Sequence, residues 1–86
     1  MALYFLDYDL RKQRNYQPLW DQLKEFEAVR ILDSTWCFNR VNTTPEGLRN
    51  FFQQFIDADD GLVVSEVTNW ASYKTLGTPN NLRSVA

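Results

Sequence analysis

The chain opens with the stretch Ala2-Leu-Tyr-Phe-Leu-Asp-Tyr-Asp-Leu10, which is apolar almost throughout and carries two carboxylates near its end. Its aromatic and aliphatic content is typical of a β-strand, which we assign to Ala2–Asp9. Side chains two positions apart on a strand project from the same face of the sheet. Asp7 and Asp9 are therefore predicted to share one face, where their carboxylates could serve a metal ion or a proton transfer.

Two segments show the apolar periodicity of helices facing a core. In the first, Pro18 suits the opening turn and the helix is expected to end near Glu27. In the second, Thr43-Thr-Pro-Glu46 combines an N-cap residue, an early proline and a glutamate in capping-box spacing. The apolar stripe of this second helix consists of Leu48, Phe51, Phe52, Phe55 and Ile56.

Further segments rich in β-branched, aromatic or alternating apolar residues predict strands: 29–32, 35–41, 62–67 and 70–76. The resulting order is β-α-β-β-α-β with one added strand. We therefore predict an α+β fold of ferredoxin-like type, with an antiparallel sheet, two helices on one face and an extra C-terminal edge strand. The opposite face of such a sheet is left uncovered, and the many aromatic residues favour a symmetric homodimer that covers it.

With 86 residues, 44% of them hydrophobic, the chain is expected to form a single domain over residues 1–77 with a loose tail over 78–86. Its net charge of −2 provides no bulk attraction to nucleic acid or to an anionic membrane. Histidine is absent, which excludes His-based catalysis and most transition-metal sites. The single Cys37 fits a reducing compartment, and the sequence shows no membrane span or signal peptide, so we expect a cytoplasmic protein.

Four short motifs occur along nearly the whole chain: Tyr8-Asp-Leu10, Val29-Arg-Ile-Leu-Asp-Ser-Thr-Trp-Cys-Phe38, Phe55-Ile-Asp57 followed by Asp60-Gly-Leu-Val-Val64, and Leu76-Gly-Thr-Pro79. In their order and spacing they resemble the CRISPR-associated adaptation protein of ferredoxin-like fold, the second core family of those systems, and its SinR-like relatives. The segment Leu32-Asp-Ser-Thr-Trp36 is similar to the SinR-like relatives in particular.

This resemblance implies a dimer in which the late strand, here Trp70–Leu76, pairs with the sheet of the partner. Trp70, Tyr73 and Leu76 are the interface residues that it implies. Some members of the family are metal-dependent nucleases, in which the aspartate ending the first strand is contributed by both protomers around one divalent ion. That aspartate corresponds to Asp9. Other members act only as a structural bridge in the spacer-integration complex, and the SinR-like relatives mostly have no assigned activity.

Two hypotheses of different classes follow. The first is a non-catalytic, dimeric interaction or assembly module that requires no cofactor and binds a protein partner. The second is a Mg²⁺-dependent endonuclease or phosphodiesterase, in which paired Asp9 residues are catalytic and Asp7 is a further candidate metal ligand. The basic residues Arg11, Lys12 and Arg14 would then contact phosphates. A third, lesser hypothesis is recognition of a small nucleotide in the dimer cleft. The acidic balance favours the first hypothesis over nucleic-acid binding, and whether the chain is an enzyme stays open.

Other chemically suggestive residues are assigned to structure. The acidic run Asp57, Asp59 and Asp60 lacks the spaced ligands of a calcium loop and is expected to be a solvated helix end. Cys37 has no second cysteine or histidine to act with and is expected to be a small buried or half-buried strand residue rather than a nucleophile. The aromatic residues Trp36, Phe38 and Trp70 are expected to pack in the core or in the dimer rather than to stack on bases.

Overall fold

The fold of the chain was analysed in a computed structural model, which describes residues 1–11 and 15–82. It is a small α+β structure with one four-stranded antiparallel sheet in the order β2-β3-β1-β4. The strands are β1 (Ala2–Asp9), β2 (Val29–Leu32), β3 (Thr35–Arg40) and β4 (Gly61–Val67). The helices are α1 (Gln17–Glu25) and α2 (Pro45–Phe52), with two short 3₁₀ turns, η1 (Gln53–Phe55) and η2 (Pro79–Asn81). This arrangement is compatible with the expected ferredoxin-like one.

Strand β1 occupies the interior of the sheet and determines what lies on each side of it. It pairs with β3 through Leu6 opposite Trp36, and with β4 through Leu6 opposite Val64. Its even-numbered side chains, Tyr4, Leu6 and Tyr8, are buried in the main core. Its odd-numbered side chains project from the opposite face because strand side chains alternate.

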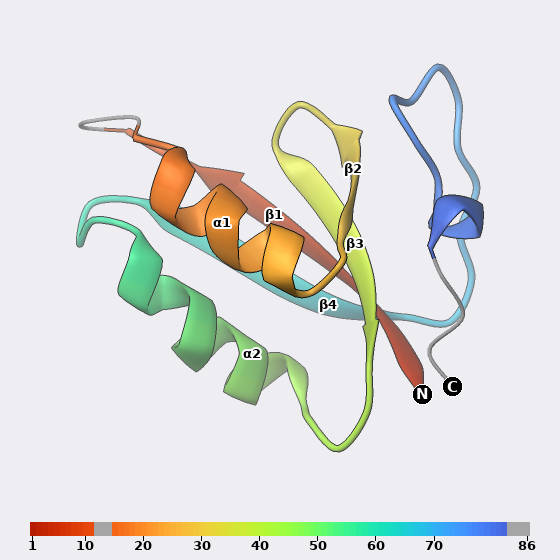
Figure 1. Cartoon of the computed structure of the whole chain (residues 1–86), viewed down its shortest axis with the longest axis horizontal. Helices are drawn as coiled ribbons and strands as arrows, with labels where there is room; N and C mark the ends of the chain where they lie inside the picture. Colours follow the sequence, from red (N-terminus) through yellow and green to blue (C-terminus); the bar gives the residue numbers. More distant parts are fainter. Residues whose placement is uncertain (12–14, 83–86) are drawn as a thin grey trace.

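Both helices cover the face that carries the even-numbered side chains of β1 (Figure 1). The other members of this core come from α1, β3 and α2: Leu19, Leu23, Trp36, Phe38, Leu48 and Phe52. Tyr8 is buried with its polar end satisfied, since its hydroxyl donates to the Asp33 carbonyl and accepts from the Trp20 indole N–H at 2.8 Å. Trp36 and Phe38, expected to pack in the core or in a dimer, both pack in this core.

Helix α2 begins one residue later than the capping-box pattern indicates. Thr44, rather than Thr43, is the N-cap residue, and its hydroxyl accepts a hydrogen bond from the Gly47 N–H at 3.1 Å. Pro45 then occupies the first helical position, where its missing N–H costs no hydrogen bond. Glu46 is one position too early for a capping box with Thr44, so it does not close one.

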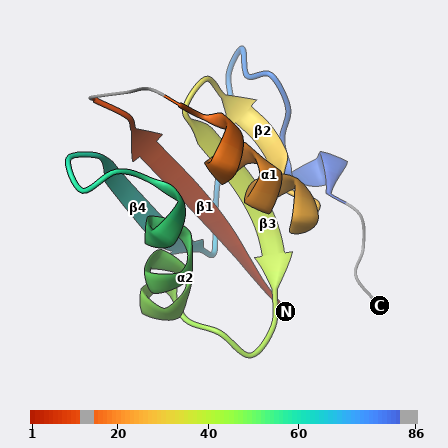
Figure 2. The same ribbon diagram turned by 60° about the vertical axis from the view of Figure 1, so that its left-hand side comes forward.

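The face of the sheet away from the helices is partly covered by the chain itself, contrary to the expectation of an uncovered face. After β4, residues 68–82, here named the C-terminal segment, cross to the β2 side of the sheet. In Figure 2 the helices lie in front of the sheet and the light-blue start of this segment passes behind it. Residues of the segment, among them Trp70 and Pro79, line a cavity together with Phe5 and Ile31 of the sheet.

The expected extra strand over 70–76 is wrong: the structure assigns no strand to these residues. The segment does approach the β2 edge, where the Leu76 N–H donates to the Ile31 carbonyl at 2.8 Å. β2 is irregular at this point, with a register shift between Arg30 and Leu32 in its pairing with β3. The turn η2 follows directly, closed by a capping box between Thr78 and Asn81.

Cys37 lies on this second face and is fully buried, which confirms the expectation of a buried strand residue. Burial raises the pKa of its thiol to about 11, while a backbone hydrogen bond at Val29 acts in the opposite direction. The thiol is therefore protonated and unreactive at neutral pH. Val29, the partner of Cys37 on β2, lies against the C-terminal segment at Gly77.

Gly77 lies tightly against β2, and Gly77→Ala is expected to weaken this contact. An added Cβ would lie 2.9 Å from Val29 Cγ1 and 3.0 Å from the Arg30 carbonyl oxygen, and a backbone atom cannot easily move aside. We expect urea denaturation to show that the free energy of unfolding falls by about 1–3 kcal/mol, as it does at other overpacked sites. Modification of Cys37 by a disulfide reagent should also become faster.

Gly47→Ala is the matched control, because its added Cβ would meet only two threonine hydroxyls, at 3.3 and 3.4 Å. It should leave the reactivity of Cys37 unchanged. Unchanged stability and unchanged thiol reactivity in Gly77→Ala would contradict the described packing.

Candidate functional site

The two carboxylates of β1 lie on the same face of the sheet, as their spacing predicts. Asp9 is opposite Gly61 of β4 and Asp7 is opposite Val63. Both side chains line one shallow hollow of about 350 Å³, together with Arg11 and the start of β4. The structure thus brings together three of the residues that the sequence singles out, Asp7, Asp9 and Arg11.

Arg11 neutralises one of these carboxylates directly. Its Nε donates to Asp9 Oδ2 at 3.0 Å, and its Nη1 donates to the Asp59 carbonyl at 3.1 Å. The side chains of Asp9 and Arg11 are 70% and 60% exposed, so this ion pair contributes only about 0–1 kcal/mol to stability. Its main consequence is positional, because it holds the guanidinium across the end of the sheet beside Gly61.

Asp7 has a different environment from Asp9. It is half-buried, and its Oδ1 accepts a hydrogen bond from the Thr35 hydroxyl at 2.5 Å. Thr35 is a buried polar residue of β3 and lies directly opposite Asp7 in the sheet. Among the described residues, Thr35 is the one donor to the Asp7 carboxylate, so Oδ2 is left for a further donor.

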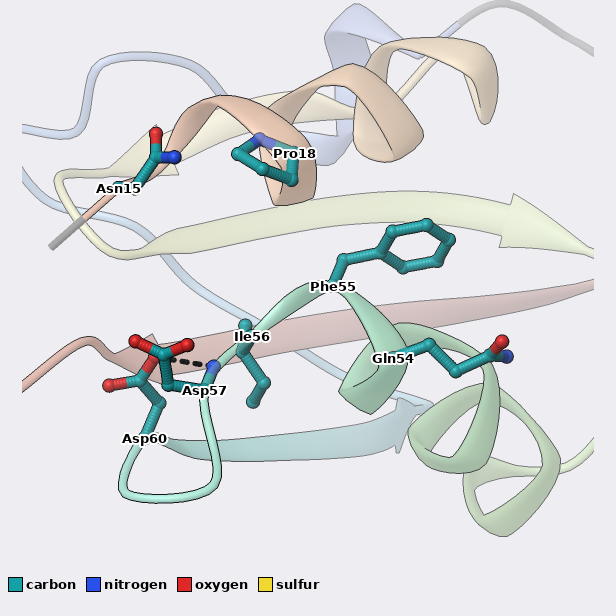
Figure 3. A pocket seen from close by; sticks show the side chains of 7 residues that line it. All are labelled: Asn15, Pro18, Gln54, Phe55, Ile56, Asp57 and Asp60. Carbon is teal, nitrogen blue, oxygen red and sulfur yellow. Dashed lines mark hydrogen bonds between the residues drawn. The ribbon is translucent and has the colours of Figure 1, made fainter. Parts of the chain in front are cut away.

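Asp60 has a structural role that sequence reasoning missed. Its Oδ1 accepts from the Arg11 N–H at 2.8 Å, and its Oδ2 accepts from the Asp57 N–H at 2.9 Å. The carboxylate therefore joins the end of β1 to the turn that leads into β4. Figure 3 shows Asp57 and Asp60 facing each other at the edge of a hollow of about 250 Å³, with Asn15 and Phe55 also lining it.

The available signal for this role was the position of Asp60, immediately before the strand residue Gly61. An aspartate at the end of a short acidic turn commonly accepts hydrogen bonds from nearby backbone N–H groups. The acidic run is consequently not only a solvated helix end, since one of its carboxylates ties two strands together.

The other residues in the expected sites are distributed as follows. Lys12 and Arg14, the expected phosphate contacts beside Arg11, lie outside the described residues. Of the expected dimer contacts, Trp70 is turned partly inward and lines the cavity under the C-terminal segment. Tyr73 and Leu76 are 80% and 65% exposed, so both are accessible to a partner.

A single chain does not fit a magnesium site as it stands. Across residues 1–11 and 15–82 there is no group of three or more His, Cys, Asp or Glu side chains placed to hold a metal ion. Asp9 is paired with Arg11, and a guanidinium competes with a cation for the same carboxylate oxygens. A metal site built on Asp9 would therefore need ligands from a second copy and the displacement of Arg11.

Comparison with known proteins adds no assignment to this geometry. No protein-family model matches the chain. A search of solved structures also found no match. The resemblance to the CRISPR adaptation family accordingly stays a prediction from the motifs. Within the part of the chain that the structure describes, no helix has the length and apolar character needed to cross a bilayer.

The bridging role of Asp60 leads to a stability prediction. Asp60→Ala removes both acceptors and leaves the Arg11 and Asp57 N–H groups without this partner. Hydrogen bonds to a charged group contribute about 1.5–3 kcal/mol to stability. At this half-exposed position we expect the free energy of unfolding to fall by an amount near the lower end of that range. Chemical denaturation of Asp60→Ala and of the wild type measures this difference in stability.

Glu25→Ala, which removes an exposed carboxylate of α1, serves as the control and should change stability by less than about 0.5 kcal/mol. Equal stability of the Asp60 and Glu25 variants would show that the bridge between the two strands is not formed in solution.

Proposed function

We propose that this chain is a small dimeric interaction or assembly module of ferredoxin-like fold, resembling the CRISPR adaptation family and working without catalysis. The observation that carries the proposal is the outer edge of β4. In the four-stranded sheet this strand has a neighbour on one side only, namely β1. Its outward backbone groups are therefore available to a further strand.

The two edges of the sheet differ in how they are protected. The β2 edge is irregular and is approached by the C-terminal segment. In contrast, β4 pairs with β1 in an uninterrupted register over its whole length, Gly61–Val67. It has neither the proline nor the lysine with which edge strands commonly resist pairing, and Val63 is 59% exposed on it. These features favour pairing with a partner.

A second copy of the chain is a suitable partner for this edge. Antiparallel pairing of two β4 strands around Val64 would place Glu66 of one copy opposite Leu62 of the other. Leu62 lines a hollow together with Arg49 of α2, so Glu66 of one copy would approach Arg49 of the other. A two-fold axis repeats this contact, and each copy contributes both members of a complementary pair.

The absence of catalysis in this proposal is supported by the state of the acidic residues. Asp9 is paired with Arg11, and Asp60 is engaged by two backbone N–H groups. The sequence has no histidine that could act as a general base. An exposed edge and a surface with Tyr73 and Leu76 suit assembly better than they suit a reaction.

The proposed dimer is tested by light scattering and sedimentation on Val63→Lys and Glu66→Arg. A lysine on the edge should oppose strand pairing, and the charge reversal should place like charges together, each weakening association about tenfold or more. The double variant Glu66→Arg with Arg49→Glu should restore association because it recreates the pair in reverse.

Val41→Lys is the matched control, because Val41 is similarly exposed, at 54%, but lies outside β4. Leu76→Lys tests the alternative interface on the C-terminal segment. A wild-type chain that stays monomeric at all concentrations would overturn the proposal.

The nuclease hypothesis is kept as a second candidate because Asp7, Asp9 and Arg11 line one hollow. It requires a dimer in which two Asp9 carboxylates meet. Like charges brought together in this way repel each other unless a cation neutralises them. Mg²⁺, a hard cation that prefers oxygen ligands, would supply that charge and activate water for attack on a phosphodiester.

Calorimetric titration with Mg²⁺ and Mn²⁺ separates the two candidates. The non-catalytic module predicts no saturable binding in the wild type and no difference in Asp9→Asn. The nuclease predicts one ion per dimer, lost in Asp9→Asn but retained in Asp21→Asn, which changes an exposed carboxylate of α1. Metal binding with that pattern would replace the first proposal by the second.

A further inference from the structure

The cavity under the C-terminal segment has a size suited to a small ring compound. Its volume is about 190 Å³, and its floor is the sheet face opposite the helices. An enclosed apolar cavity of about 150 Å³ is enough to bind benzene in another protein. This cavity is therefore large enough for one or two fused rings. It is too small to enclose a whole nucleotide.

Aromatic residues line the cavity from both sides. Phe5 belongs to the central strand β1, and Trp70 belongs to the C-terminal segment. Both are half-buried, so each ring still has surface to offer to a ligand. A flat ligand between Phe5 and Trp70 would stack on their aromatic rings. Proteins that bind nucleic-acid bases without recognising their sequence commonly use such stacking.

The polar groups of the cavity point to hydrogen-bond donors on the ligand. Asp7 and Thr35 both line it, and they are hydrogen-bonded to each other through Asp7 Oδ1. A carboxylate oxygen has two acceptor sites, so Oδ1 can accept a second hydrogen bond while Oδ2 accepts another. Two adjacent acceptors of this kind match two adjacent N–H donors on a planar ring.

The charge of the lining selects against anionic ligands. Asp7 is the only charged residue among the described residues that line the cavity. Arg11 shares a neighbouring hollow with Asp7, but its guanidinium is already paired with Asp9 there and it does not line this cavity. A phosphate group bound next to Asp7 would be repelled, whereas a neutral ring with N–H donors would not.

We propose that this cavity binds a guanine-type heterocycle, a planar neutral ring with adjacent N–H donors, as a free base or nucleoside. The two donors on its edge meet Asp7, and its ring lies between Phe5 and Trp70. This site lies within one chain and contains no phosphate contact, so it differs from a nucleotide site in a dimer cleft. It is independent of the proposed dimer, because its residues do not belong to β4.

The experiment compares guanosine with inosine, which lacks only the 2-amino group, by ¹H–¹⁵N NMR titration of the full chain. We expect guanosine to shift the Trp70 indole and Thr35 amide signals saturably. Inosine should bind about tenfold or more weakly because one charged hydrogen bond is missing. Absence of saturable shifts with guanosine, or equal affinity for both nucleosides, would overturn the proposal.

Three variants locate the site. Asp7→Asn retains an oxygen that Thr35 can bond but loses the charge, and should weaken guanosine binding about tenfold to a hundredfold. Trp70→Ala should weaken it about tenfold. Asp21→Asn, which changes an exposed carboxylate of α1 outside the cavity, should bind as the wild type does. Circular dichroism checks that each variant is folded, and unchanged affinity in both cavity variants would overturn the assignment.

A last arm distinguishes a free nucleoside from a base within nucleic acid. A single-stranded tetranucleotide containing guanine should bind more weakly than guanosine, because its phosphates would approach Asp7 and a chain of net charge −2. Tighter binding of the tetranucleotide, lost with added salt, would replace the nucleoside proposal by single-strand recognition.

Discussion

The alternation of side chains along β1 is the constraint on which the rest of the structure depends. Because this strand is interior to the sheet, each of its faces must be covered or polar. On one face, Tyr4, Leu6 and Tyr8 pack in the core that α1 and α2 cover. On the other face, Phe5 and Asp7 line the cavity beneath the C-terminal segment. A shift of one residue in register would exchange the two faces and lose both arrangements.

The two faces are covered in physically different ways. The helix side is a continuous apolar core in which even a buried hydroxyl, that of Tyr8, is satisfied by Trp20 and the Asp33 carbonyl. The other side is covered by a segment without regular secondary structure beyond the η2 turn. Such a segment packs less completely than a helix, and a cavity is left beneath it. The same segment also approaches the β2 edge, whereas β4 has β1 as its neighbour on one side only.

Three aspartates at one end of the sheet show how environment assigns roles to one residue type. Asp60 holds two backbone N–H groups and ties β1 to the entry of β4. Asp9 is exposed and paired with Arg11, so its charge is locally neutralised. Asp7 shares one oxygen with Thr35 and faces a cavity of otherwise uncharged residues. Asp7 thus lines two neighbouring hollows, the cavity beneath the C-terminal segment and the one beside the start of β4.

The sequence by itself determined the elements whose signals are local. The strand at Ala2–Asp9, the shared face of Asp7 and Asp9, and the first part of the apolar stripe of α2, Leu48 to Phe52, follow from periods of two and 3.6 residues. The stripe was predicted to continue to Ile56, but Phe55 lies in the turn η1 and Ile56 is extended. The sequence also indicated that Cys37 is buried or half-buried and that Trp36 and Phe38 pack in the core or in a dimer; all three are buried. Only the tertiary structure decided features that depend on contacts between distant segments. Residues 70–76 form no strand, and this stretch reaches the edge of β2 through the hydrogen bond from the Leu76 N–H to the Ile31 carbonyl. The same holds for the pairing of Arg11 with Asp9 and for the bridge at Asp60. It also holds for the cavity between Phe5 and Trp70. These contacts join residues that are distant in the chain or that have several possible partners, and no local sequence pattern specifies them.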